Sequence, residues 1–184
     1  MERAAQAAGV DCRNESRRLP DGQPQRRRGT GTGTGTGTGR HQGAPPGEAR
    51  LTGLDTNILV RCFAHDDARQ TAAALQLIDE QLDAGQPGHV SIVAVAELVW
   101  VLRSIYAAEK AVAADILDHL LSDRRFVVQQ GDAVWAALDI YKTLAVDFGD
   151  SLIAALDRDA GCTRTLSFDR AAARIPGVQR LGAH

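Results

Sequence analysis

The sequence has few cysteines and lacks a long apolar run. Its three cysteines, Cys12, Cys62 and Cys162, lie far apart and match no metal-binding or redox spacing. An odd, sparse set of this kind favours a reducing cytoplasm over a disulfide-stabilised scaffold. No apolar segment reaches the roughly 18 residues that a membrane span requires, because the closest one, residues 90–102, contains a serine and a glutamate. The N-terminal residues also lack the apolar region of a signal peptide. These absences predict a cytoplasmic protein that does not enter a membrane.

Aromatic residues are scarce, and the first 50 residues contain none. This segment holds ten of the eighteen glycines and four of the six prolines, and residues 29–39 alternate strictly between Gly and Thr. Its apolar surface is too small to offset the entropy lost on ordering the backbone. We therefore predict that residues 1–50 form a disordered, low-complexity extension. Residues 51–184 are long enough to form one domain with its own core.

The charge is divided in the same way. Residues 1–50 carry nine Arg and five acidic residues, a net charge of +4, whereas residues 51–184 carry a net charge of −6. An acidic domain is not an obvious nucleic-acid binder. If it binds RNA, metal ions and a local group of basic residues must reverse the field at the site. Arg61 and Arg170 lie nearest in sequence to the candidate site residues below.

Short apolar strands alternate with helical segments along residues 51–184. We expect strands at residues 51–54, 89–91, 126–128, 163–167 and 178–181, and helices at residues 56–64, 66–82, 92–106, 111–121, 133–144, 150–160 and 169–173. This alternation predicts an α/β fold in which a central parallel sheet is flanked by helices through right-handed crossovers.

Four acidic residues lie where such a sheet binds ligands. Asp55 closes the first strand, and Asp169 follows the fourth. Glu97 lies in the first turns of the helix after the second strand, and Asp150 begins the helix before the fourth strand. The carboxyl ends of parallel strands and the starts of the following helices share one edge of the sheet, where ligands bind. Asp150 joins this edge only if its helix also begins there.

Each of these acids also has a purely structural interpretation. Asp55 and Asp169 could cap the helices that they precede, since Asp is a preferred N-cap residue. Asp147 and Asp150 are spaced like a cap and its partner in the first turn, so either one could be structural. Glu97 lies in an apolar segment that predicts a buried helix. A buried carboxylate must be paired, protonated or bound to a metal.

A converged set of four carboxylates would require cations. At about 5 Å and an effective dielectric of about 20, each pair of carboxylates repels by roughly 3 kcal/mol. Ligation by oxygen alone favours Mg²⁺ or Mn²⁺. One or two such ions could activate a water molecule and stabilise the charge that develops during phosphodiester hydrolysis. The set of four acids therefore predicts a metal-dependent phosphodiesterase.

Other motifs carry less information. The Gly-Thr repeat is not a dinucleotide-binding loop, because Thr34 occupies the place of its third glycine and no strand precedes it. The five histidines show no ligand spacing. Trp100 and Trp135 lie on apolar helix faces, which predicts core or interface positions rather than surfaces for stacking bases.

Four segments together resemble a known family. Residues 54–60 (LDTNILV), 96–98 (AEL), 147–155 (DFGDSLIAA) and 166–170 (LSFDR) are similar, in order and spacing, to the four acidic motifs of PIN domains. This order and spacing resemble those of the VapC-type toxins of bacterial toxin–antitoxin pairs. The resemblance covers essentially all of residues 51–184. Each motif alone is weak, but four in the same order form a specific pattern.

The resemblance implies an Mg²⁺-dependent endoribonuclease that cuts cellular RNA, is inhibited by a VapB-type antitoxin and forms a homodimer. It implies that the catalytic and metal-binding residues are Asp55, Glu97, Asp150 and Asp169. Thr56, Asn57 and Ser167 would be supporting polar groups. The sequence departs from the family pattern at Ser151, where Ala is common, and in its 50-residue upstream stretch. We therefore expect the family domain to begin near Leu51.

The sequence has three other interpretations. A phosphate-receiving regulatory domain would need an Asp after residues 126–128 and a late Lys, but two Gln follow that strand and no Lys lies beyond Leu144. A dehalogenase-like phosphatase needs a second Asp where Asn57 stands. A catalytically inactive PIN-fold interaction module remains as the alternative, because motif matches include false positives.

Overall fold

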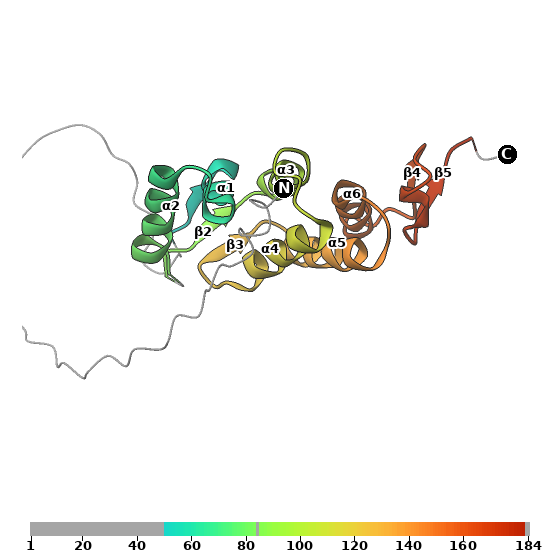
Figure 1. Cartoon of the computed structure of the whole chain (residues 1–184). Coiled ribbons are helices and arrows are strands. Elements are labelled where there is room, and N and C mark those ends of the chain that lie inside the picture. Colours follow the sequence, from blue (N-terminus) through green and yellow to red (C-terminus); the bar gives the residue numbers. More distant parts are fainter. Residues whose placement is uncertain (1–49, 84, 183–184) are drawn as a thin grey trace, which may run out of the picture. The chain divides into compact units, whose positions relative to one another are not determined.

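The computed structural model describes residues 50–83 and 85–182 (Figure 1). The predicted extension over residues 1–50 therefore lies, except for Arg50, outside the described residues. The helices are α1 (Thr56–Ala64), α2 (Ala68–Gln81), α3 (Ile92–Ser104), α4 (Lys110–Ser122), α5 (Gly131–Thr143), α6 (Phe148–Asp159) and the short 3₁₀ helix η1 (Ala172–Arg174). The strands are β1 (Thr52–Leu54), β2 (Gly88–Val90), β3 (Phe126–Val128), β4 (Thr165–Ser167) and β5 (Val178–Arg180).

The predicted α/β fold with a parallel sheet is confirmed. Strands β1, β2 and β3 form a parallel sheet in the order β1-β2-β3, and β2 is paired on both sides. The central strand begins with a glycine for a packing reason. A Cβ atom on Gly88 would lie 2.5 Å from Cδ1 of Leu54 and 3.0 Å from Cδ1 of Leu82. A residue with a side chain at this position would require the Leu54 and Leu82 side chains to shift.

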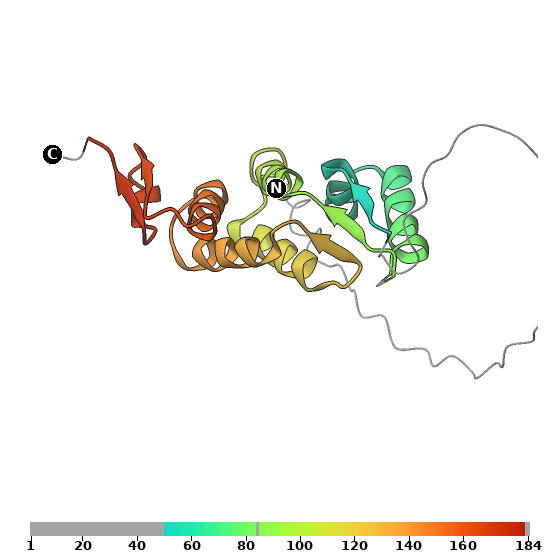
Figure 2. The ribbon, with the colours of Figure 1, turned by 180° about the vertical axis from the view of Figure 1, so that it is seen from behind.

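The main core lies between the first sheet and its helices. Helix α1 packs against α2 and α3, while α4 and α6 pack against α5. Figure 2 shows the same arrangement from behind. The largest fully buried apolar side chains of this core include Leu59, Val90, Val95, Leu98, Leu117 and Leu138. No helix among the described residues is long and apolar enough to cross a membrane.

Strands β4 and β5 do not join the first sheet, which corrects the expectation of one continuous sheet. They pair in parallel with each other as a second, two-stranded sheet. In both views they lie next to α6 (Figures 1 and 2). Ile175 and Val178 pack with Val146 and Ala154 in a small core of their own. The Thr165 hydroxyl also donates to Asp157 on α6 at 2.7 Å. These contacts hold β4 on α6 instead of on β1.

Candidate functional site

The first acidic group joins the start of α1 to α3. Asp55 occupies the N-cap position of α1, but its side chain makes no capping hydrogen bond. Its carboxylate instead accepts from Asn57 Nδ2 at 3.1 Å and is exposed. The buried Thr56 donates from Oγ1 to Glu97 Oε2 at 2.6 Å. The capping interpretation therefore does not explain Asp55. Thr56, the next residue in the sequence, orients the Glu97 carboxylate through its hydrogen bond.

Glu97 is exposed, so the prediction that it lies on a buried helix is wrong. Helix α3 buries one side, through Ala94, Val95, Leu98, Val99 and Leu102. Its other side exposes Val93, Glu97 and Trp100. Because α3 is apolar on nearly every face, its composition does not reveal which side meets the core. The Glu97 carboxylate is available to a ligand from solvent.

The second acidic group lies at the start of α6. Asp150 is half-buried in the first turn of this helix. Burial raises the pKa of its carboxyl group, and the negative charges of Asp169 and Asp147 raise it further. Asp147 is at the N-cap position but makes no side-chain capping bond. Ser151, where the family pattern commonly has Ala, is buried, and its hydroxyl donates to the Asp147 carbonyl at 2.9 Å. The extra polar group is therefore hydrogen-bonded within the same helix turn.

Asp169 forms a turn after β4. One of its carboxylate oxygens accepts from the Ala171 backbone N–H at 2.7 Å. Its own backbone N–H donates to Ser167 Oγ at 3.0 Å. Ser167 thus supports Asp169 through the backbone. Part of the structural interpretation of Asp169 holds, since it stabilises the turn that leads to η1.

The four predicted acids therefore form two groups in this structure. Asp55 and Glu97 are linked through Thr56, and Asp150 is close enough to Asp169 for their charges to interact. Within residues 50–83 and 85–182, no set of three or more His, Cys, Asp or Glu side chains is placed to hold a metal ion. The oxygen donors suit Mg²⁺ or Mn²⁺ chemically. The accumulated negative charge around Asp150 is also what a cation would relieve. The geometry, however, does not form a complete metal centre.

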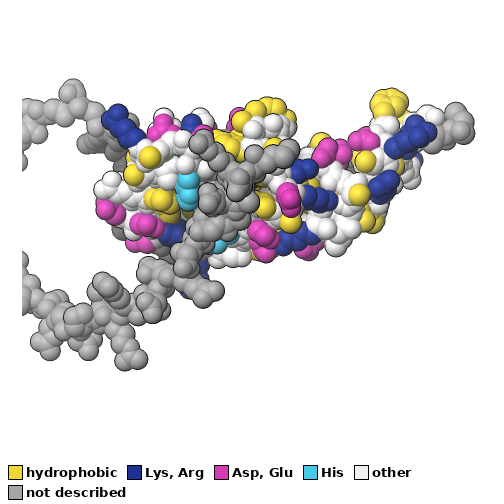
Figure 3. Space-filling model, in the orientation of Figure 1, with side chains coloured by type: hydrophobic (Ala, Val, Ile, Leu, Met, Phe, Trp, Pro, Cys, Tyr) yellow, Lys and Arg dark blue, Asp and Glu magenta, His cyan; other side chains and the backbone are white. Residues whose placement is uncertain are grey.

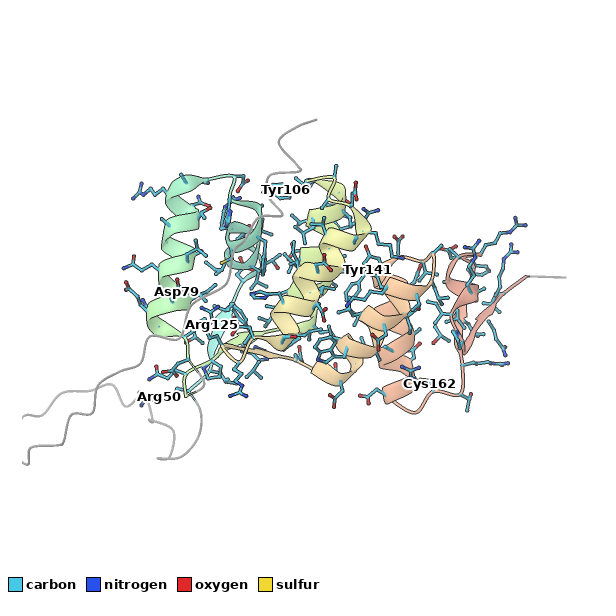
Figure 4. The ribbon with its side chains drawn as sticks, turned by 60° about the horizontal axis from the view of Figure 1, so that its bottom comes forward. Arg50, Asp79, Tyr106, Arg125, Tyr141 and Cys162 are labelled. Carbon is cyan, nitrogen blue, oxygen red and sulfur yellow. The ribbon has the colours of Figure 1, made fainter. Side chains whose placement is uncertain are left out.

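Basic residues near the second group were missed by the sequence analysis. Lys110 Nζ donates to the Leu144 carbonyl at 2.5 Å and lies 4.4 Å from the centre of the ring of Tyr141, the residue labelled on α5 in Figure 4. Its pKa is lowered by burial and by the charge of Arg103, while Asp147 opposes this effect. The one available signal was its position at the first residue of α4, where the helix dipole disfavours a cation.

The two arginines expected near the site differ in their surroundings. Arg61 is held by Asp66 at 2.5 Å and by Gln70 at 2.6 Å. The Tyr106 hydroxyl donates to the same Asp66 at 2.6 Å (Figure 4). Arg170 is exposed beside Asp169. Figure 3 shows basic and acidic side chains interspersed over the visible face rather than one continuous basic patch. Arg170 is therefore the better candidate of the two for contact with phosphate.

The part of the chain that contains the four acids matches a known family. Residues 54–178, more than half of the chain, match the PIN domain. The match begins one residue before Asp55, contains Glu97, Asp150 and Asp169, and ends at the first residue of β5. No curated protein matches the chain. The matched length, with an α/β fold and a parallel sheet, shows that the chain belongs to the PIN domain family.

Proposed function

We propose that this protein is an Mg²⁺-dependent endoribonuclease of the VapC type, the cytoplasmic toxin of a toxin–antitoxin pair. PIN domains are typically metal-dependent nucleases. The observation that carries the proposal is the placement of the four acids within the matched region. Two of them are linked through the Thr56–Glu97 hydrogen bond, and two interact around the start of α6. The catalytic and metal-binding residues in this proposal are Asp55, Glu97, Asp150 and Asp169.

The supporting residues position these carboxylates. Thr56 holds Glu97, Asn57 donates to Asp55, and Ser167 accepts from the backbone of Asp169. Bound Mg²⁺ or Mn²⁺ would supply the positive charge that an RNA phosphodiester and its attacking water require. The negative charge of the half-buried Asp150 is disfavoured by burial and by its two acidic neighbours, which raise its pKa. This carboxylate would therefore gain most from a nearby cation.

The partners follow from the VapC-type resemblance. The substrate is cellular RNA, and a VapB-type antitoxin silences the enzyme in a complex with a homodimer. Within the net acidic domain, Arg61 and Arg125 are held by aspartates, which lowers their availability to RNA. Arg170, which is exposed next to Asp169, and Arg103, which is exposed at the C-terminal end of α3, would supply local positive charge. An antitoxin that covers them would block RNA binding.

An inactive PIN-fold interaction module is the second candidate. The observation that favours it is the separation of the acids into two groups, neither of which contains three metal ligands within the described part of the chain. Such a protein would still fold and could still bind a partner. It would show no cleavage at any metal concentration.

RNA cleavage with and without chelation separates the two candidates. Full-length protein is incubated with a mixed RNA substrate in Mg²⁺, and EDTA is added to a parallel sample. We expect cleavage that EDTA abolishes and that excess Mg²⁺ restores. Asp55→Asn and Glu97→Gln should each abolish it. Asp132→Asn, which removes an exposed acid from the first turn of α5, is the matched control and should retain activity. Absence of cleavage by a folded wild-type protein would favour the interaction module.

A further inference from the structure

Helix α3 exposes a tryptophan, so the structure excludes the core position that was one of the two sequence-based expectations for Trp100, the other being an interface. The Trp100 side chain is 60% exposed, whereas Trp135 on α5 is half-buried. A tryptophan carries a large apolar ring, and leaving it in water forgoes the stabilisation of burial. The exposed indole of Trp100 is available to bind a ligand that has an apolar face.

The neighbours of Trp100 on α3 are charged. Glu97 precedes it by three residues and Arg103 follows it by three, and both are exposed. Residues three apart on a helix are surface neighbours. Because each such step turns the helix face by about 60° in the same direction, Trp100 lies between Glu97 and Arg103 both along the helix and around it. The ring is therefore flanked by a carboxylate on one side and a guanidinium on the other, while Ala96 and the exposed Val93 lie along the helix on its N-terminal side.

The same face of α3 runs from one acidic group toward the other. Its Glu97 is bonded to Thr56, beside Asp55. Its C-terminal end carries Arg103, whose positive charge lowers the pKa values of Lys110 and Tyr141. The negative charge of Asp147 raises the pKa values of the same two residues, so Arg103 and Asp147 both lie near them. Helix α3 also packs against α6, and Asp147 is the N-cap residue of α6. Trp100 thus lies on the stretch of α3 between the two groups.

We propose that Trp100 is a stacking platform for one base of single-stranded RNA next to the phosphodiester at Glu97. This inference rests on the proposed nuclease function. Every base offers a flat face to an aromatic ring, and single strands leave these faces free. The Arg103 guanidinium, three residues along the helix, would contact a phosphate of the same strand. The centre of a protein–protein interface is instead depleted of charged residues, whereas Glu97 and Arg103 are both exposed next to this ring.

Fluorescence of Trp100 provides a direct test. The chain has only two tryptophans, so Trp135→Phe leaves Trp100 as the sole indole. This variant is titrated with a short, unstructured oligoribonucleotide, with Ca²⁺ in place of Mg²⁺ to slow cleavage. We expect the Trp100 emission to be quenched on binding. The quenching should be much weaker with an oligonucleotide of equal length that carries abasic residues.

Binding affinity tests the same contact in the otherwise unchanged full-length protein. Trp100→Ala should weaken RNA binding about 10-fold or more, the loss expected for one base–aromatic stack. Trp100→Phe should retain most of the affinity, because a phenyl ring still stacks. Val93→Ala, which trims another exposed apolar residue of α3, is the matched control and should bind as wild type does.

Three results would overturn the inference or its basis. If wild-type protein binds RNA and Trp100→Ala binds it equally well, the stacking role is wrong while the nuclease proposal stands. If Trp100→Ala converts a dimer into a monomer in light scattering, and the abasic oligonucleotide quenches as fully as the intact one, the face is a contact between copies. If wild-type protein neither binds nor cuts RNA, the proposed function itself fails.

Discussion

Replacing Asp150 by Asn tests whether this carboxylate is a ligand among like charges or a helix cap. Asn caps a helix about as well as Asp, so a capping role predicts little change. In the structure, burial and the charges of Asp169 and Asp147 raise the pKa of Asp150. A carboxyl group whose pKa is raised on folding contributes its full stability below its unfolded pKa. It loses that stability as the pH rises through the folded pKa. At neutral pH the charged form therefore destabilises the metal-free protein.

The expected gain follows from three opposing contributions. Repulsion from two partly solvated neighbours is worth up to about 1 kcal/mol each, by analogy with exposed charge pairs, and burial adds to it. The dipole of α6 opposes the gain by about 0.3–1 kcal/mol, because Asp150 lies in its first turn. Two neighbouring negative charges and burial raise the pKa and act together against this single dipole. We expect Asp150→Asn to stabilise the metal-free protein by roughly 0.5–1 kcal/mol, or about 2–4 °C in Tm.

Melting curves with and without Mg²⁺, beside an RNA cleavage assay, measure this effect. The metal-free variant should melt above wild type at pH 7, and the difference should vanish as the pH falls below about 4. Mg²⁺ at 100 times its Kd should stabilise wild type by about 2.7 kcal/mol and the variant by less. Cleavage should be lost in Asp150→Asn but largely retained in Asp147→Asn. An unchanged Tm with retained cleavage would refute the ligand role. Loss of cleavage only in Asp147→Asn would identify that residue as the third acid.

Three further predictions concern other parts of the chain. We propose that residues 51–184 form the working domain, so deleting residues 2–49 should leave Tm and RNA cleavage unchanged within error. A loss of several degrees or of activity would contradict this. Arg170→Ala should weaken RNA binding and lower its salt dependence by about one phosphate contact, whereas Arg124→Ala should not; equal effects would mean that the binding face is misplaced. Burial raises the pKa of the Cys62 thiol to about 11, so a thiol reagent at pH 8 should modify the exposed Cys162 and spare Cys62 until the protein unfolds.

Local pattern predicted the helices and strands of this fold well. The strand at residues 126–128 matches β3 at both ends, and the helix at residues 56–64 matches α1. These elements have a clear apolar period or a clear break at each end. The partner of a strand is a different matter, because pairing depends on contacts far apart in sequence. Nothing in residues 163–167 distinguishes pairing with β1 from pairing with β5. The small core around Ile175 decides it.

The candidate site was predictable in its residue types but not in its geometry. The order of the four acids followed from their motifs. The exposure of Glu97 did not, because α3 is apolar all around and has no pattern that selects a buried side. Likewise, Arg61 was expected to be available to RNA, but a turn brings Asp66 onto it, and Tyr106 reaches the same carboxylate from 40 residues away.

The missing side chain of Gly88 ties distant positions of the chain to one another. A methyl group there would collide with Leu54, and Leu54 is the residue immediately before Asp55. A larger residue at position 88 would therefore require the Leu54 and Leu82 side chains to move, because their Cδ1 atoms would lie 2.5 and 3.0 Å from its Cβ atom. Position 88 is thus coupled to the residue next to the first carboxylate, although it contributes no group to the site.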